Sequence, residues 1–207
     1  MASVIIHLAI AKELKDDLDI DNYYDYYLGS IAPDIARQIG LDKNISHFSS
    51  NMRNDIPDID LFVKRYPTFK YNSFNLGYFI HLYTDKLWEE EFIPKITNKD
   101  IIKLLDGTIL NLNEIDLRNL IYSDYTNLNI QFIEEYNLDL SLFYEEFKTP
   151  NTPLNEIPIN KLDILLNKIG IIIENSKSEK QYIFDIYAIK DFIKEIKERI
   201  KEELKKY

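Results

Sequence analysis

The segment 72–93, NSFNLGYFIHLYTDKLWEEEFI, most constrains how this chain folds, because it places two polar side chains on an apolar stripe. His81 and Asp85 are four residues apart, so on a helix their Cβ atoms lie about 5–6 Å from each other on one face. The stripe also contains Phe74 and Trp88, which are typical of a core. Burying an unpaired carboxylate costs several kcal/mol, so the pattern favours a divalent cation as its partner.

Gly77 lies on the same stripe, one turn before His81. A glycine inside a helix costs about 1 kcal/mol relative to alanine. We therefore expect the missing side chain to make room for something bulky next to the histidine.

Helical periodicity extends through most of the chain, which predicts an all-α fold with about seven to nine helices in a single domain, 1–207. Segment 41–55 reads as a loop, 110–137 as one or two helices with a possible break near 124–127, and 169–173 is the only candidate strand. The expected helix starts are at Ser3, Asp21, near Asp58, and at Asp139, Asn160 and Ser178.

Composition excludes several classes of protein. The net charge of -10 argues against a surface for duplex nucleic acid, which requires clustered Lys and Arg. There is no cysteine, so any metal must be bound by His, Asp or Glu. No stretch is apolar over the 18 or so residues that a bilayer requires, and no leader peptide is recognisable, so we expect a cytoplasmic protein without a transmembrane segment.

Candidate metal ligands come from four separate segments. The chain has only three histidines, His7, His47 and His81, and the carboxylates of Asp34 and Asp85 complete the set. A mixed nitrogen and oxygen site of this kind suits Zn²⁺ and tolerates Mn²⁺ or Fe²⁺. Each residue alone also has an ordinary interpretation: His7 as a hydrogen-bonded core residue, Asp34 as a charge at a helix N-terminus, and His47 as a solvated loop residue.

The order of these motifs resembles the zinc-dependent phospholipase C family, over roughly the first 95 residues. The resemblance rests on His7, LGSIAPD at 28–34, SHF at 46–48 and LGYFIHLYTDKLW at 76–88. It implies an all-α bundle of the phospholipase C and single-strand nuclease type. It also implies that one metal is bound by Asp34, His47, His81 and Asp85, and that His7 with Asp85 contacts a second.

The family has a further ligand group of two His and a Glu downstream, whereas no histidine follows position 81 here. Glu89, Asp124 and Asp185 are the carboxylates considered as substitutes. The resemblance thus implies one complete metal site and at most a partial neighbour.

The function expected from the resemblance is hydrolysis of a phosphoester by water activated on the metal, with Asp34 as ligand and general base. A small phosphoester or a phospholipid headgroup is the expected substrate. Arg37 and Lys86 lie within a turn of the proposed ligands and are candidates for neutralising phosphate. Two alternatives stay open: a non-catalytic protein whose metal holds helices together, and a metal-free helical interaction module that uses the isoleucine stripe of the last helix. An HD-type phosphohydrolase has no support, because the chain lacks a His-Asp dipeptide.

Overall fold

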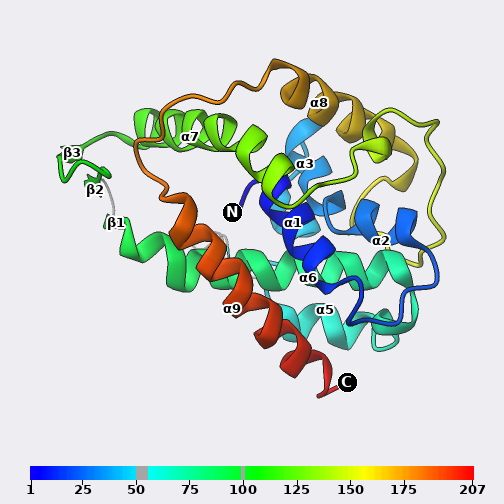
Figure 1. Ribbon diagram of the computed structural model, residues 1–207. Coiled ribbons are helices and arrows are strands. Elements are labelled where there is room, and N and C mark those ends of the chain that lie inside the picture. Colours follow the sequence, from blue (N-terminus) through cyan, green and yellow to red (C-terminus); the bar gives the residue numbers. More distant parts are fainter. Residues whose placement is uncertain (50–55, 99–100) are drawn as a thin grey trace.

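The computed structural model describes residues 1–49, 56–98 and 101–207, and helices dominate it (Figure 1). The α-helices of these described residues are α1 (Val4–Leu14), α2 (Tyr23–Gly29), α3 (Ile35–Gln38), α4 (Lys43–Ser46), α5 (Ile59–Arg65), α6 (Ser73–Leu87), α7 (Glu114–Glu135), α8 (Leu162–Asn175) and α9 (Ile186–Leu204). The described strands are β1 (Thr97–Asn98), β2 (Ile101–Lys103) and β3 (Ile109–Asn111).

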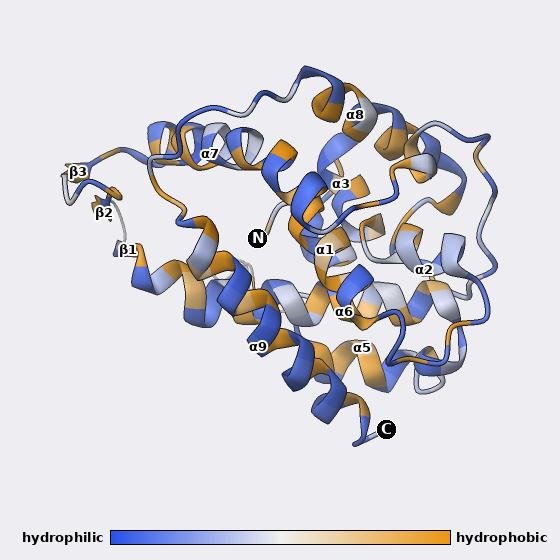
Figure 2. Ribbon diagram, in the orientation of Figure 1, coloured by the Kyte–Doolittle hydropathy of each residue, from blue (hydrophilic) through white to orange (hydrophobic). Residues whose placement is uncertain are grey.

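Helix α1 lies at the centre of the molecule, where it contacts α6, α7 and α9 (Figure 1). Helix α6 packs closely against the shorter helix α2 and also contacts α5 and α9. Figure 2 shows hydrophobic residues on the parts of α1, α6 and α9 that turn towards the interior. One cluster of buried apolar residues extends from Ala2 to Leu204, so residues near both ends of the chain contribute to the same core.

Several sequence predictions are confirmed. Ser3 caps α1, accepting a hydrogen bond from the N–H of Ile6, and Asp58 caps α5. The central helix is capped by Asn72 and continues as a π-helical turn after Leu87. Of the helix expected over 110–137, residues 114–135 form α7 without a break, whereas 110 and 111 belong to β3. The candidate strand at 169–173 is wrong, because this segment lies within α8.

The expectation of a purely helical chain is wrong in one region. Strands β1, β2 and β3 form a small antiparallel sheet beside the helices, with β2 in the middle (Figure 1). The hairpin between β2 and β3 turns at Asp106 and Gly107, where Gly107 has a φ of 87° and the Asp106 carboxylate accepts a hydrogen bond from the N–H of Thr108. Asp-Gly between apolar residues is a strong hairpin signal, and it overrode the helical periodicity.

Other predicted boundaries need correction because a different residue caps the helix. Asn22 rather than Asp21 caps α2, and α9 begins at Ile186, capped by Asp185, rather than near Ser178. The segment after Asp139 forms only a short 3₁₀ turn, and Asn160 lies inside another that precedes α8. Within the expected loop 41–55, residues 43–46 form α4, and 50–55 lie outside the described residues.

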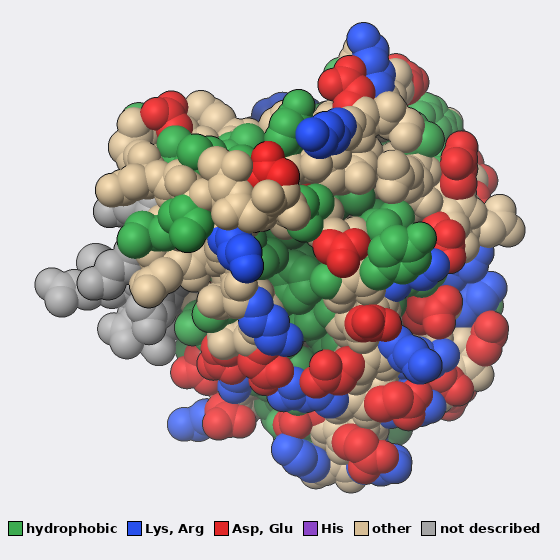
Figure 3. Space-filling model, turned by 60° about the vertical axis from the view of Figure 1, so that its left-hand side comes forward, with side chains coloured by type: hydrophobic (Ala, Val, Ile, Leu, Met, Phe, Trp, Pro, Cys, Tyr) green, Lys and Arg blue, Asp and Glu red, His purple; other side chains and the backbone are tan. Residues whose placement is uncertain are grey.

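The surface mixes charges of both signs with scattered apolar side chains. Figure 3 shows acidic and basic groups interspersed over the lower part of one face. None of the three histidines, all of which lie in described segments, is visible on that face, in agreement with their burial. Among the described helices, none combines the length and the apolar composition that crossing a bilayer requires.

Candidate metal centre

Helix α6 supplies the centre of the site. His81 and Asp85 are both completely buried, and the Nε2 atom of His81 lies 3.4 Å from the Oδ2 atom of Asp85. Phe74 and Trp88, on the same stripe, are buried as the sequence predicted. The polar pair is therefore part of the interior rather than of the solvated face of the helix.

Gly77 serves a different purpose from the one expected. A Cβ atom at this position would lie 2.1 Å from the carbonyl oxygen of Tyr26, so the space beside Gly77 is filled by the backbone of α2. The contact is reciprocal, since a Cβ atom at Gly29 would lie 2.1 Å from the carbonyl oxygen of Phe74. These two glycines let α2 and α6 approach closely, which brings the carbonyl oxygen of Ser30 to 2.8 Å from Nδ1 of His81.

This hydrogen bond fixes how His81 faces the site. A carbonyl oxygen can only accept, so Nδ1 of His81 carries a proton and donates a hydrogen bond to the carbonyl of Ser30. The other ring nitrogen, Nε2, faces Asp85 and His47 and is the one available to a metal. Metal-binding histidines are commonly oriented in this way by a backbone carbonyl.

His47 is oriented by the same device. It follows α4 directly, and its Nδ1 atom lies 3.1 Å from the carbonyl oxygen of Lys43 and 2.9 Å from the hydroxyl of Ser46. Donation from Nδ1 to Lys43 leaves Nε2 facing inward. The Nε2 atoms of His47 and His81 are 3.4 Å apart, so the two ring nitrogens that are free of backbone carbonyls face each other in the interior.

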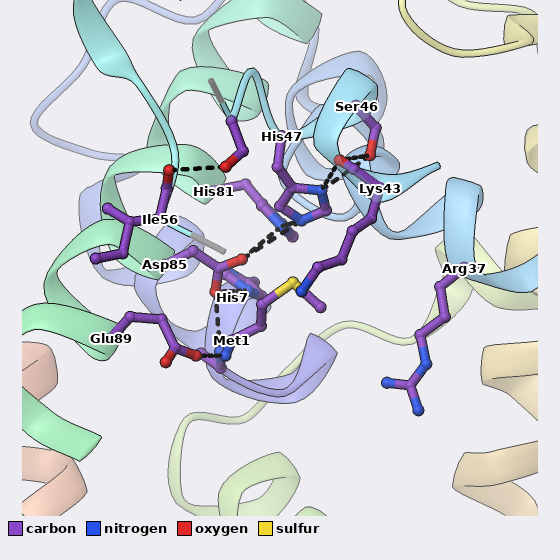
Figure 4. Close-up of polar contacts among 12 residues, drawn as sticks. Met1, His7, Arg37, Lys43, Ser46, His47, Ile56, His81, Asp85 and Glu89 are labelled. Atoms are coloured by element: carbon purple, nitrogen blue, oxygen red, sulfur yellow. Dashed lines mark hydrogen bonds and ion pairs between the residues drawn. The ribbon is translucent and has the colours of Figure 1, made fainter. Parts of the chain in front are cut away.

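The spacing of these donors fits a metal ion. The Oδ2 atom of Asp85 lies 3.5 Å from Nε2 of His47 and 3.4 Å from Nε2 of His81. In a tetrahedral site with bonds of about 2.0–2.2 Å, donor atoms lie roughly 3.3–3.6 Å from one another. Figure 4 shows these side chains directed towards a common point. The three donors thus have the separations that zinc requires.

His7 and Asp34 extend the cluster. The ring of His7 stacks on that of His81 with centroids 3.7 Å apart, and its Nε2 atom lies 3.3 Å from Oδ1 of Asp85. Donor atoms of His7, Asp34 and His81 lie within 4.8 Å of one another, as do those of His47, His81 and Asp85. The five expected residues therefore converge, but as two overlapping groups that share His81, with Asp34 on the side of His7.

Asp85 carries the negative charge of the site. Burial is the largest influence on the pKa of its carboxyl and raises it, but His7 and His81 outweigh burial and hold that pKa well below its usual value. Its Oδ1 atom accepts a hydrogen bond of 2.9 Å from the N–H of Ala2. Its Oδ2 atom accepts none from the described residues, although a buried carboxylate oxygen needs a positive partner.

The charge of Asp85 raises the pKa of both imidazoles, but the net shifts of His81 and His7 have opposite signs. Burial lowers the pKa of His81, yet the carboxylate of Asp85 overcomes burial and raises it above its ordinary value. The pKa of His7 is lowered, first by burial and then by the neighbouring His81. Neither ring nitrogen of His7 has a hydrogen-bond partner among the described residues. A cation among His47, His81 and Asp85 would engage the free oxygen of Asp85, and the unpaired nitrogens of His7 are further donors beside it. The residues present therefore fit a metal.

The carboxylates considered for the family's downstream ligand group have other partners. Glu89 pairs with the amine of Met1 at the edge of the cluster (Figure 4). Asp124 accepts hydrogen bonds from three backbone N–H groups, and Asp185 caps α9. None of the three joins a metal-compatible group among the described residues. The sequence could not predict the carbonyls of Ser30 and Lys43 that orient the imidazoles, because every residue has a main-chain oxygen.

A pocket of about 470 Å³ opens beside the cluster, and Asp34 is part of its wall. Asp34 is 8% exposed, whereas His81 and Asp85 are fully enclosed. Of the candidate ligands, Asp34 alone lines this pocket. A molecule in the pocket therefore meets the metal centre at Asp34.

Comparisons with protein-family models, with curated proteins and with solved structures find no significant match to this chain. The function must therefore be argued from the geometry of the site.

Proposed function

We propose that this chain is a metal-dependent hydrolase of phosphoesters that resembles zinc-dependent phospholipase C, with Zn²⁺ as the preferred ion. The observation that carries the proposal is the set of separations of 3.4, 3.4 and 3.5 Å among Nε2 of His47, Nε2 of His81 and Oδ2 of Asp85. These three atoms belong to buried side chains. Backbone carbonyls of Ser30 and Lys43 orient the two imidazoles, and the N–H of Ala2 donates a hydrogen bond to the other oxygen of Asp85. His7 and Asp34 supply additional donors next to them.

The residues have distinct roles in this proposal. His47, His81 and Asp85 would hold the ion, and His7 would bind on the side of Oδ1 of Asp85. When bound, the ion supplies a Lewis acid for a phosphoryl oxygen and lowers the pKa of a bound water to about 7. Asp34, at the boundary between cluster and pocket, is placed to accept a proton from water or to serve as a ligand. The buried aromatic and aliphatic residues around the site exclude bulk water.

A structural metal site is the second candidate, and the burial of the donors favours it. His47 is 2% exposed, and His81 and Asp85 are fully buried, as in sites whose metal only holds the fold together. The pocket that reaches Asp34 favours the hydrolase instead, since catalytic zinc sites keep one position open to substrate.

Elemental analysis of purified protein, combined with hydrolysis of a phosphoester panel, tests the proposal. We expect stoichiometric zinc in the wild type and little in Asp85→Asn, together with hydrolysis by the wild type that stops on chelation and returns when zinc is added. Asp34→Asn should keep most of the zinc and lose hydrolysis. A zinc-loaded wild type that cleaves no phosphoester and unfolds on chelation would instead establish the structural role.

A further inference from the structure

The pocket beside Asp34 has features that go beyond the metal centre. It lies between the start of α1 and helices α3, α7 and α8, and its walls include Asp34, Arg37, Tyr122, Ile169, Ile172 and Ile173. Its volume of about 470 Å³ is roughly three times that of an engineered cavity that accommodates one benzene. It also falls within the range of about 300–1,000 Å³ that is usual for small-molecule sites. The pocket can thus hold a compact molecule but not two long acyl chains or several nucleotides.

One wall is positively charged. Arg37 follows Asp34 by one helical turn, and its guanidinium lies 4.1 Å from the centroid of the Tyr122 ring and donates a hydrogen bond to the Tyr122 hydroxyl. No carboxylate of the described residues lies within ion-pairing distance of Arg37, although the chain has 35 acidic and 25 basic residues. A guanidinium has five N–H donors arranged to suit phosphate oxygens. Tyr122 therefore holds the side chain in place while leaving most of its donors for an anion.

The opposite wall is apolar. Ile169, Ile172 and Ile173 have the spacing of one face of α8, and all three line the pocket. Ile172 is 45% exposed, so a ligand that covers it gains from the burial of apolar surface. The adjacent Ile171 is 58% exposed but does not line the pocket. The pocket is therefore cationic at Arg37 and apolar along α8.

We propose that this pocket binds a small anionic phosphoester with one compact apolar group, such as an aryl or short-chain alkyl phosphate. The phosphate oxygens would be bound by Arg37, and the apolar group would lie on Ile172 and its neighbours. This inference rests on the proposed function, because it names the substrate class of the same site.

Titration calorimetry with two non-hydrolysable probes, 1-naphthylphosphonate and methylphosphonate, tests the proposal in both chelated and zinc-loaded protein. We expect Arg37→Gln to weaken binding of both probes about tenfold or more, the loss typical of a charged hydrogen bond. Ile172→Asn should weaken naphthylphosphonate about fivefold or more and leave methylphosphonate unchanged. The matched controls are Ile171→Asn and Arg118→Gln, an exposed arginine on α7 that pairs with Glu114. Circular dichroism verifies that each variant is folded.

Equal effects of Ile171→Asn and Ile172→Asn, or unchanged affinity in Arg37→Gln, would overturn the inference. Hydrolysis separates this result from the proposed function. Probe binding that depends on Arg37 and Ile172, in a zinc-loaded protein that cleaves no phosphoester, supports the ligand class and rejects the hydrolase. Hydrolysis of phosphoesters without dependence on these two residues supports the hydrolase and rejects the assignment of the pocket.

Discussion

Asp85 and Asp124 are both completely buried, yet they represent two different uses of a carboxylate. Asp124, on α7, accepts hydrogen bonds of 2.7, 2.9 and 2.8 Å from the backbone N–H groups of Tyr182, Ile183 and Phe184. These bonds attach the chain before α9 to α7 and compensate for burial of the charge. Asp124 is thus a structural residue whose partners are all within the fold.

Asp85, on α6, has a much less complete environment. It receives one backbone hydrogen bond, from Ala2, and its Oδ2 atom faces two imidazole nitrogens at 3.4 and 3.5 Å. The difference shows that burial alone does not identify a site. A metal site is indicated when a buried carboxylate oxygen has no hydrogen-bond donor and faces oriented imidazoles, because only a cation or a proton can then compensate its charge.

Removal of the Asp124 carboxylate should cost the protein the most stability. Asp124→Ala would leave three backbone N–H groups without an acceptor, at roughly 1–3 kcal/mol each. We expect the free energy of unfolding, measured with urea, to fall by about 3 kcal/mol or more. Zinc bound per folded molecule should not change, and loss of zinc from folded Asp124→Ala protein would show that the two carboxylates are not independent.

The second prediction concerns the zinc-dependent part of the stability. At a free zinc concentration of about 100 times its Kd, binding should raise the free energy of unfolding of the wild type by roughly 2.7 kcal/mol. In Asp85→Asn this increment should vanish, because a neutral amide cannot balance the cation. The measurement is urea unfolding with and without zinc, and Asp124→Asn is the control that should keep the increment.

The sequence predicted the surroundings of Asp85 but suggested Asp124 only as a substitute metal ligand, and Asp124 joins no metal-compatible group among the described residues. The difference has a physical reason. Asp85 is recognisable because its partner His81 is four residues away on the same helix and both interrupt an apolar stripe. Asp124 gives no such signal, since its partners are main-chain groups 58 to 60 residues further along the chain. Contacts within one helix can be inferred from spacing, whereas long-range contacts to the backbone cannot.

The same distinction explains the rest of the fold. Apolar periodicity and capping residues predicted α1, α5 and α6, because these are local properties. The hairpin at Asp106 and Gly107 had a local signal as well, but the surrounding isoleucines and leucines also suit a helix. The convergence of His7, Asp34 and His47 on α6 is a tertiary property, and the family resemblance rather than any local pattern suggested it.

Gly77 on α6 and Gly170 on α8 should respond differently to substitution by alanine. Gly77→Ala would place a Cβ atom 2.1 Å from a carbonyl oxygen of α2, and overpacking of this kind costs about 1–3 kcal/mol. Because Ser30, whose carbonyl orients His81, directly follows α2, zinc affinity should fall too. Gly170→Ala on α8 is the control, since its nearest neighbour in Phe143 would be 3.8 Å away. It should gain up to about 1 kcal/mol from helix propensity. Equal urea midpoints for the two variants would contradict the close contact between α2 and α6.

Two serine hydroxyls, that of Ser46 next to His47 and that of Ser176 next to Asn129, should contribute least. Ser46 lies 2.9 Å from Nδ1 of His47, but that nitrogen also has the carbonyl oxygen of Lys43 as a partner. Ser46→Ala should therefore weaken zinc binding only a few-fold, equivalent to about 1 kcal/mol or less, and leave the stability of the chelated protein almost unchanged.

Ser176, at the end of α8, accepts a hydrogen bond from Asn129 on α7. Ser176→Ala should lower stability by about 1 kcal/mol with no change in zinc affinity. Zinc titrations and urea unfolding of both variants measure the two effects, and a change in zinc affinity for Ser176→Ala would mean that the α7–α8 region also helps to position the metal.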